Sequence, residues 1–272
     1  MSRLAEIIAT RKQRIAAAKN AVARHSLESL AETAREQAPS HALLSALSRV
    51  DGVNIIAEFK RRSPSKGLIR DGANPATMAQ QYERGGAVAI SVLTEPDYFD
   101  GSLDDLREVR TATALPILRK DFVVDEYQVW ESAAARADAL LLIVAALNDS
   151  ELQSFRRLTE DHFGMDALVE VHTAVEMERA IDCGARIIGV NNRNLATFEV
   201  SLDTSIELAA AKAGDNVLVS ESGIETIDDI QRLRAAGYQG FLIGETLMRS
   251  GNPAALLAEL TQRTANANGP AK

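Results

Sequence analysis

Charged and amide side chains stand at the ends of several short aliphatic runs in the sequence. They are two lysines, three carboxylates and one amide: Lys60, Lys120, Glu58, Glu170, Glu221 and Asn191. A lysine ammonium can donate a proton or stabilise negative charge on an oxygen, and a carboxylate can remove a proton. Brought together, these groups could carry out acid and base chemistry.

Side-chain alternation predicts that these groups face one way. Successive side chains of a strand point to opposite faces, so Ile56, Glu58 and Lys60 share a face. If Ile56 fills the interior of a barrel, Glu58 and Lys60 face its mouth. The same reasoning points residues inward on four later strands: Leu118 with Lys120, Leu168 with Glu170, Ile187 and Gly189 with Asn191, and Val219 with Glu221. An ion-pair network that only closes one end is the alternative, but burying so many charges is costly, which favours a functional site.

The loops beside these groups favour an anionic ligand. The turns at 221–223 and 244–246 carry glycine at the position where (β/α)8 barrels commonly bind phosphate through backbone N–H groups. The loop at 61–67 carries three cations and two hydroxyls and directly follows Lys60, which favours a mobile lid over an anion. Ordinary turn geometry and a solvated loop are the respective alternatives.

The elements that must position these groups alternate between strand and helix. A polar turn and a helix-forming stretch follow each predicted strand, as at Asn74-Pro75 before Ala76–Arg84 and at Asp203 before Thr204–Lys212. Eight such units predict a single (β/α)8 TIM barrel of the α/β class. An open doubly wound sheet is disfavoured, because no GxGxxG motif or P-loop follows the first strand. The eight strands are expected at Val53–Lys60, Ala87–Leu93, Pro116–Lys120, Ala139–Ala145, Ala167–Val171, Arg186–Asn191, Asn216–Glu221 and Gly240–Gly244.

The first 50 residues differ from the rest of the chain. They are rich in Ala, Leu, Glu and Arg, contain no strand-like run, and place apolar residues from Leu4 to Ile15 at helical spacing. We therefore expect a helical N-terminal extension over residues 1–50, packed on a barrel over residues 51–263, and a flexible C-terminal tail over residues 264–272.

Composition excludes several classes of protein. The 272 residues are 46% hydrophobic and 25% charged, which is typical of a globular chain. The net charge of -8 (30 cations minus 38 anions) argues against nucleic acid as a partner. No apolar run approaches the length of a membrane span, so no membrane association is expected. Cys183 is the only cysteine, which excludes an intramolecular disulfide and favours a cytoplasmic location.

The histidines and the cysteine are not expected to take part in chemistry. His25, His41, His162 and His172 lack metal-ligand spacing and are interpreted as surface residues. His172 shares the inward face of Glu170 by alternation, but we expect it to end the strand and begin the next helix. Cys183 precedes Gly184 at a helix end and is interpreted as a small packed residue.

Seven ordered motifs give the chain a specific resemblance. The sequence looks like the indole-3-glycerol phosphate synthase family from about residue 1 to 263. The resemblance implies a (β/α)8 barrel enzyme of tryptophan biosynthesis, a carboxy-lyase that uses no cofactor and no metal. The motifs are AEFKRRSPS at 57–65, SVLTE at 91–95, YFDGS at 98–102, LRKDF at 118–122, VEVH at 169–172, GVNNRNL at 189–195 and SESGI at 220–224.

The resemblance also implies roles for individual residues. Lys120 corresponds to the general acid that protonates the substrate's ribulose carbonyl, and Glu170 to the general base. Lys60 corresponds to the lysine at the base of the first loop, with a share in the acid role. Three residues correspond to groups that orient the lysines and the sugar hydroxyls: Glu58, Asn191 and Glu221. The substrate-binding residues are Ser63, Pro64, Phe99, Phe122, Arg193, Leu195 and Ser222, and those at the phosphate are Gly223, Gly244 and Glu245.

One departure and two alternatives accompany this interpretation. Glu245 stands where some relatives have a small hydroxyl residue, so its carboxylate is expected to point away from phosphate. No second barrel follows, which predicts a monofunctional enzyme acting on an anionic sugar phosphate as a monomer or a weak homo-oligomer. The alternatives are another phosphate-binding barrel, either an isomerase or an aldolase, and a non-catalytic anion-binding subunit.

Overall fold

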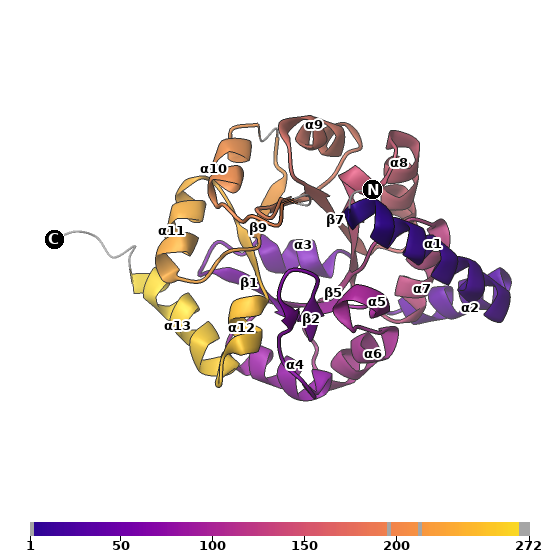
Figure 1. Ribbon diagram of the computed structural model, residues 1–272, viewed down its shortest axis with the longest axis horizontal. Helices are drawn as coiled ribbons and strands as arrows, with labels where there is room; N and C mark the ends of the chain where they lie inside the picture. The colour runs from indigo at the N-terminus through magenta and orange to yellow at the C-terminus, as the bar shows by residue number, and fades with distance from the viewer. Residues whose placement is uncertain (1–2, 195–196, 212–213, 267–272) are drawn as a thin grey trace.

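Eight parallel strands close into a barrel at the centre of the molecule (Figure 1). The structure is a computed structural model that describes residues 3–194, 197–211 and 214–266. The first strand of the ring pairs with both the second and the last, which closes it. In order around the ring the strands are β1 (Asn54–Phe59), β10 (Gly240–Ile243), β9 (Val217–Glu221), β8 (Ile187–Asn191), β7 (Asp166–Val171), β6 (Ala139–Ile143), β5 (Ile117–Lys120) and β4 (Ala89–Leu93).

Helices surround the barrel, and most begin at a side-chain cap. The Asn74 side chain accepts the N–H of Thr77, and Asn148 and Glu151 form a reciprocal capping box. The elements outside the ring are α4 (Pro75–Arg84), α5 (Pro96–Phe99), α6 (Leu103–Ala112), α7 (Glu126–Ala134), η1 (Val144–Ala146), α8 (Asp149–Arg157), η2 (Leu158–His162), α9 (Ala174–Asp182), α10 (Asp203–Ala209), α11 (Ile227–Ala235), α12 (Glu245–Arg249) and α13 (Pro253–Asn266).

The two faces of each strand belong to different cores. The inward side chains form one apolar cluster inside the barrel, while the outward ones pack beneath the helices. On β1, Ile56 lies in the inner cluster, and Ile55, Ala57 and Phe59 lie in the outer one, as alternation predicts. The inner cluster also contains the other residues expected to point inward: Leu118, Leu168, Ile187 and Val219.

The N-terminal segment supplies three helices: α1 (Arg3–Ala21), α2 (Arg24–Arg35) and α3 (Ala42–Leu47). Leu43 and Leu47 of α3 belong to the inner cluster, and the Asn54 side chain donates to the Leu47 carbonyl, so α3 closes the end of the barrel where the strands begin. Figure 1 shows α1 on the opposite side, facing the viewer, with its first residues near β7. This segment therefore contacts both ends of the barrel.

The predicted fold class is confirmed, and the predicted strands differ from the observed ones only near their ends. The second strand starts at Ala89 instead of Ala87, because the Ala87 N–H bonds back to Tyr82 at the end of α4. The fourth strand ends at Ile143 instead of Ala145, since the next residues turn into η1. Helix α13 continues to Asn266, and residues 267–272 of the predicted tail lie outside the described residues. Within the described part of the chain, no helix is both long and apolar enough to cross a bilayer.

Candidate active site

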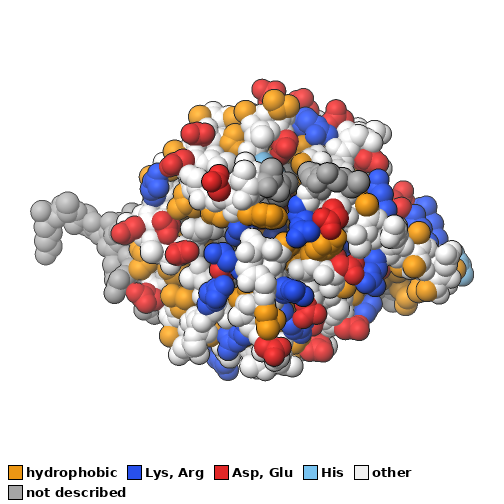
Figure 2. Space-filling model, in the orientation of Figure 1, with side chains coloured by type: hydrophobic (Ala, Val, Ile, Leu, Met, Phe, Trp, Pro, Cys, Tyr) orange, Lys and Arg blue, Asp and Glu red, His pale blue; other side chains and the backbone are white. Residues whose placement is uncertain are grey.

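A cavity of about 630 Å³ opens at the end of the barrel where the strands finish. Its floor includes apolar side chains of the barrel interior, such as Leu141 and Leu242. Part of its rim comes from α1, through Arg3, Leu4 and Ile7. Figure 2 shows this face, where lysine and arginine side chains lie beside apolar ones around the centre. A cavity with an apolar floor and charged walls suits an anion that also carries an apolar group.

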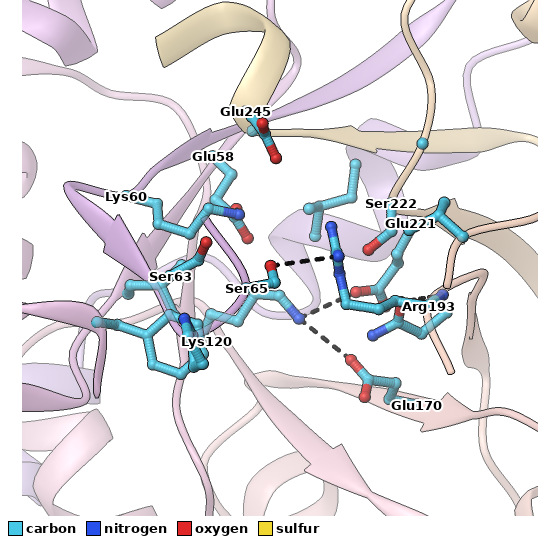
Figure 3. Close-up of a pocket in the computed structure, with 18 of the residues that line it drawn as sticks. Glu58, Lys60, Ser63, Ser65, Lys120, Glu170, Arg193, Glu221, Ser222 and Glu245 are labelled. Atoms are coloured by element: carbon cyan, nitrogen blue, oxygen red, sulfur yellow. Dashed lines mark hydrogen bonds and ion pairs between the residues drawn. The ribbon is translucent and has the colours of Figure 1, made fainter. Parts of the chain in front are cut away.

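Lys120, at the end of β5, lies at the centre of the charged groups. Its Nζ lies 3.1 Å from Oε2 of Glu170 and 3.0 Å from Oε2 of Glu221 (Figure 3). The side chains of these two glutamates are 3% and 1% exposed. A second ion pair joins Lys60 to Glu58 at 2.5 Å. The ends of β1, β5, β7 and β9 therefore bring two ammonium groups and three carboxylates together.

These neighbours shift the ionisation of the central groups. Burial alone would lower the pKa of Lys120, but the charges of Glu221, Glu170 and Glu58 raise it above its ordinary value. Burial would raise the pKa of Glu170, but the Lys120 and His172 charges, with hydrogen bonds from Lys120 and Asn191, lower it. Burial raises the pKa of Glu221 to about 7, against the attraction of Lys120. One ammonium shared by two carboxylates thus favours ionisation of Glu170 over Glu221.

Two glycines make room for the carboxylates. A Cβ at Gly189 of β8 would collide with the Glu221 carboxylate, and a Cβ at Gly244 would collide with that of Glu58. Both positions are therefore fixed by steric contact with the charged groups. Gly244 also begins the turn into α12. It therefore belongs to one of the glycine-bearing turns and at the same time lies against the carboxylate of Glu58.

The turns after β9 and β10 form the wall beside Glu221. Ser222 and Gly223 adopt positive φ angles of 68° and 79°, and both line the cavity with Gly244 and Glu245. The Glu245 carboxylate pairs with Arg249, one turn further along α12, at 3.0 Å. Backbone N–H groups and the Ser222 hydroxyl are therefore the donors that these residues can offer to an anion.

The first loop forms a small hairpin over the cavity, from β2 (Arg62–Ser63) and β3 (Gly67–Leu68). The Ser65 hydroxyl accepts a hydrogen bond of 3.3 Å from Arg193, which links the hairpin to the loop after β8. The Arg61 guanidinium makes two 2.7 Å bonds to Asp105 and stacks over Phe59, so it anchors the base of the loop.

Two aromatic rings form the wall near α1. The Phe99 and Phe122 centroids lie 6.1 Å apart. The buried Glu95 carboxylate holds Phe99 in place, because it accepts the N–H groups of Asp97, Tyr98 and Phe99 at the start of α5. Phe122 directly follows Asp121, whose carboxylate accepts its N–H. The apolar faces of these rings, which are tilted by 40° to each other, suit an aromatic ligand group.

The structure brings the site residues expected from the sequence around one cavity. All of them line it except Leu195, which lies outside the described residues. Ser63 and Pro64 come from the hairpin, and Asn191 and Arg193 from the end of β8 and its loop. Among the residues that the structure describes, no group of three His, Cys, Asp or Glu side chains is arranged to hold a metal ion.

The sequence analysis did not predict that residues of α1 and Phe198 line the cavity. These residues do not lie in strands, so side-chain alternation could not assign them a direction. The expected place of His172 between a strand and a helix is correct, because β7 ends at Val171 and Thr173 caps α9, but the expected surface exposure of His172 is wrong. The His172 side chain is only 11% exposed and lies between Glu170 and Glu176. The signal was present, because alternation from Glu170 puts His172 on the same inward face.

The two sequence comparisons with known proteins agree on one family. A family model described as indole-3-glycerol phosphate synthase matches residues 4–260. The chain is 46% identical over 258 residues to the indole-3-glycerol phosphate synthase of Laribacter hongkongensis, covering 94% of this chain and 98% of that protein. It is 47% identical over 264 residues to that of Kineococcus radiotolerans, covering 96% and 95% of the two chains.

Solved structures of low sequence identity share the fold alone. The crystal structure of 3-hexulose-6-phosphate synthase superposes with a TM-score of 0.61 at 16% identity, over 78% of this chain and 99% of that one. The N-acetylmannosamine-6-phosphate 2-epimerase from Clostridium perfringens gives 0.59 at 15% identity, over 78% and 93%. The barrel by itself does not decide among such proteins. The match along nearly the whole sequence does, and this chain belongs to the indole-3-glycerol phosphate synthase family.

Proposed function

We propose that this chain converts 1-(2-carboxyphenylamino)-1-deoxyribulose 5-phosphate to indole-3-glycerol phosphate, with loss of CO2 and water, in tryptophan biosynthesis. The observation that carries the proposal is the position of the Lys120 ammonium, which contacts two buried carboxylates inside a cavity with aromatic and glycine-bearing walls. The substrate has matching parts: a carbonyl, an aromatic carboxylate and a phosphate.

Lys120 is the general acid for ring closure in this proposal. The ring carbon that bears the carboxylate attacks the ribulose carbonyl carbon, a carbon–carbon bond forms, and the carbonyl electron pair moves to oxygen. That oxygen takes a proton from Lys120, because the new alkoxide is more basic than an amine even when the pKa of the amine is raised. CO2 then leaves, and its bonding electrons restore the aromatic ring.

Glu170 is the base for the dehydration that follows. The former carbonyl oxygen leaves as water with a proton from Lys60, while Glu170 removes a proton from the neighbouring carbon to form the double bond of the new ring. Ionised Glu170 suits this role, since its pKa is held below the ordinary value. Lys120 bonds Glu170 directly before substrate binds, and once Lys120 has given its proton to the carbonyl oxygen its positive charge no longer pairs with Glu170.

The walls of the cavity supply the binding contacts. The turns carrying Ser222, Gly223, Gly244 and Glu245 offer backbone N–H groups to the phosphate. Ser63 completes this side from the hairpin. The aromatic ring packs against Phe99 and Phe122, with Pro64 as a further contact and Arg193 at the substrate carboxylate. Holding the aromatic ring against the carbonyl lowers the activation free energy of ring closure by roughly several kcal/mol, because the reacting atoms are already oriented.

The raised pKa of Lys120 speaks against the aldolase alternative. A lysine that forms a Schiff base must be unprotonated, which is favoured by a lowered pKa. The carboxylates around Lys120 have the opposite effect. Borohydride trapping of Lys120 with a ketose phosphate would support an aldolase instead.

The test is an assay of the purified protein with the synthetic substrate, following the fluorescence of the indole product with and without a chelator. Wild type should form product in both conditions, and Glu170→Gln should lose at least about 100-fold in kcat. Absence of product with wild type, or full activity in Glu170→Gln, would contradict the proposal.

A cytoplasmic location and a monomer or weak homo-oligomer belong to the same proposal. The location is supported by the composition, since a chain with a single cysteine suits a reducing compartment. Light scattering at micromolar concentration tests the second point, since a stable oligomer would contradict it.

A further inference from the structure

His172 lies at the edge of the site, two residues after Glu170 at the end of β7. Its Nε2 is 3.4 Å from Oε1 of Glu170, the carboxylate oxygen that Lys120 does not contact. Its Nδ1 is 3.3 Å from Oε2 of Glu176 in α9. The imidazole thus lies between the proposed base and a second carboxylate.

The second carboxylate fixes the position of the ring. Glu176 Oε2 accepts the backbone N–H of His172 at 2.7 Å as well as facing Nδ1. Glu176 itself stands in the first turn of α9, which Thr173 caps by accepting the Glu176 N–H. Glu176 of α9 therefore contacts both the backbone N–H and the ring Nδ1 of His172, which fixes the position of the imidazole.

The other ring nitrogen is incompletely satisfied. His172 Nε2 is buried and has no hydrogen-bond partner among the described residues, although Glu170 Oε1 is the carboxylate oxygen beside it. A buried polar atom without a partner is costly, and such atoms concentrate where a structure changes during function. Hydrogen bonds of catalytic groups are often long in the free protein and shorten in the complex.

We propose that His172 is a positioning residue, anchored by Glu176, that holds Oε1 of Glu170 and stabilises its charge when Lys120 turns to the substrate. The inference rests on the role proposed for Glu170 as the base. Without His172, Glu170 would lose a second cationic neighbour at the step where it must stay ionised.

The charges around the imidazole support a protonated ring. Burial would lower the pKa of His172, but the hydrogen bond to Glu176 and the charges of Glu170, Glu176 and Glu221 raise it. These carboxylates come from β7, α9 and β9, and Lys120 of β5 lies beyond Glu170 and Glu221. Removal of the imidazolium should therefore raise the pKa of Glu170.

Kinetics of two variants test this role. His172→Gln keeps an N–H donor near Nε2 but no charge, and Glu176→Gln keeps an acceptor without charge. We expect His172→Gln to lower kcat about tenfold at neutral pH with KM within about twofold, and to move the acid limb of the kcat profile about one unit higher. Glu176→Gln should act in the same direction more weakly. His25→Gln, at an exposed position in α2, is the matched control.

The pH profile separates positioning from packing. A residue that only fills space would change stability or kcat without moving the acid limb, so an unmoved acid limb in His172→Gln overturns the inference. If His172→Gln does not fold, the same decision falls to Glu176→Gln, which leaves the imidazole in place.

An NMR titration without substrate gives a readout that does not depend on activity. The His172 imidazole of the wild-type protein should titrate above the ordinary value, and Glu170→Gln and Glu176→Gln should each lower that value. A His172 that titrates identically in all three proteins contradicts the inference. If wild type forms no indole product, the proposed function fails by itself. If wild type is active and Glu170→Gln is inactive, the proposed function holds. An unmoved acid limb in His172→Gln would then contradict only the role proposed for His172.

Discussion

The two faces of β5 carry two charged networks that differ in how completely their atoms are bonded. On the outer face, the fully buried Arg119 donates to Thr94, Ser132 and the Gln128 carbonyl, and to the carboxylates of Asp121 and Glu131. On the inner face, Lys120 contacts Glu170 and Glu221. Glu221 Oε1 is buried without a hydrogen-bond partner among the described residues.

The difference indicates what each network does. A network with every donor and acceptor bonded has one low-energy arrangement and fixes the backbone around it. A network that lacks partners can exchange a protein contact for an atom of the substrate. Arg11 of α1 joins the complete network through two bonds to Asp121, which directly follows Lys120. The N-terminal helix thus holds the strand end from which Lys120 projects.

The largest expected effect is on the inner face. Lys120→Met keeps most of the side-chain volume and removes the ammonium, so kcat should fall by at least about 1000-fold. KM should change little, because an acid acts mainly in the transition state. Steady-state kinetics with the synthetic substrate measure both constants. A variant with normal kcat and raised KM would show that Lys120 only binds substrate.

The next effect is on the outer face and concerns stability. Arg11→Met removes one cation from the buried Asp121, whose remaining partners include Arg119 and Thr94. The free energy of unfolding should fall by about 2 to 3 kcal/mol, because the loss leaves a buried carboxylate less well paired. Denaturant titration measures it.

Arg14 provides a matched control on the same helix. It pairs with Asp97, but its side chain is 54% exposed. Arg14→Met should therefore cost less than about 1 kcal/mol. Equal losses in the two variants would contradict the distinction between a buried network and a surface pair.

A smaller effect concerns the pH dependence of stability. Burial raises the pKa of Glu221 from its ordinary 4.5 to about 7, so between these values the folded protein holds a proton that the unfolded chain has released. The contribution of Glu221 is therefore full below pH 4.5 and is lost as the pH rises through 7. In Glu221→Gln, the free energy of unfolding should therefore decline less with rising pH, by on the order of 1 to 2 kcal/mol. The difference is smaller than the pKa shift alone implies, because the titration of Glu170 is coupled to that of Glu221. Unfolding curves from pH 5 to 8 measure the change, and identical slopes would contradict the shift.

Much of the comparison between the two faces was accessible from the sequence. Period-two alternation predicted that Lys120, Glu170 and Glu221 point inward, because the strand period is fixed by backbone geometry. The outer network was not predicted, since Arg119 reads as one more charge in an aliphatic run. The members of this network lie on α1, on α7 and directly after β4, which sequence spacing does not connect.

The same limit explains why the sequence did not predict the burial of His172. Alternation gave its face, but its burial depends on Glu176, which reaches back from α9 to hold its N–H. A contact between a strand end and the following helix depends on loop geometry, which residue type alone does not determine. The alternation of side chains along a strand therefore predicted which way they point, whereas their interaction partners could be identified only from the structure.

The smallest expected effect lies at the phosphate side of the inner face. The Glu245 carboxylate pairs with Arg249 at 3.0 Å, so only its backbone is expected to meet phosphate. Glu245→Ala should change KM by less than about twofold, because an exposed ion pair contributes little. Gly244→Ala is the informative contrast, since its Cβ would collide with the Glu58 carboxylate and should impair binding strongly. A large fall in KM for Glu245→Ala would mean that the carboxylate repels the bound phosphate and turns toward the cavity.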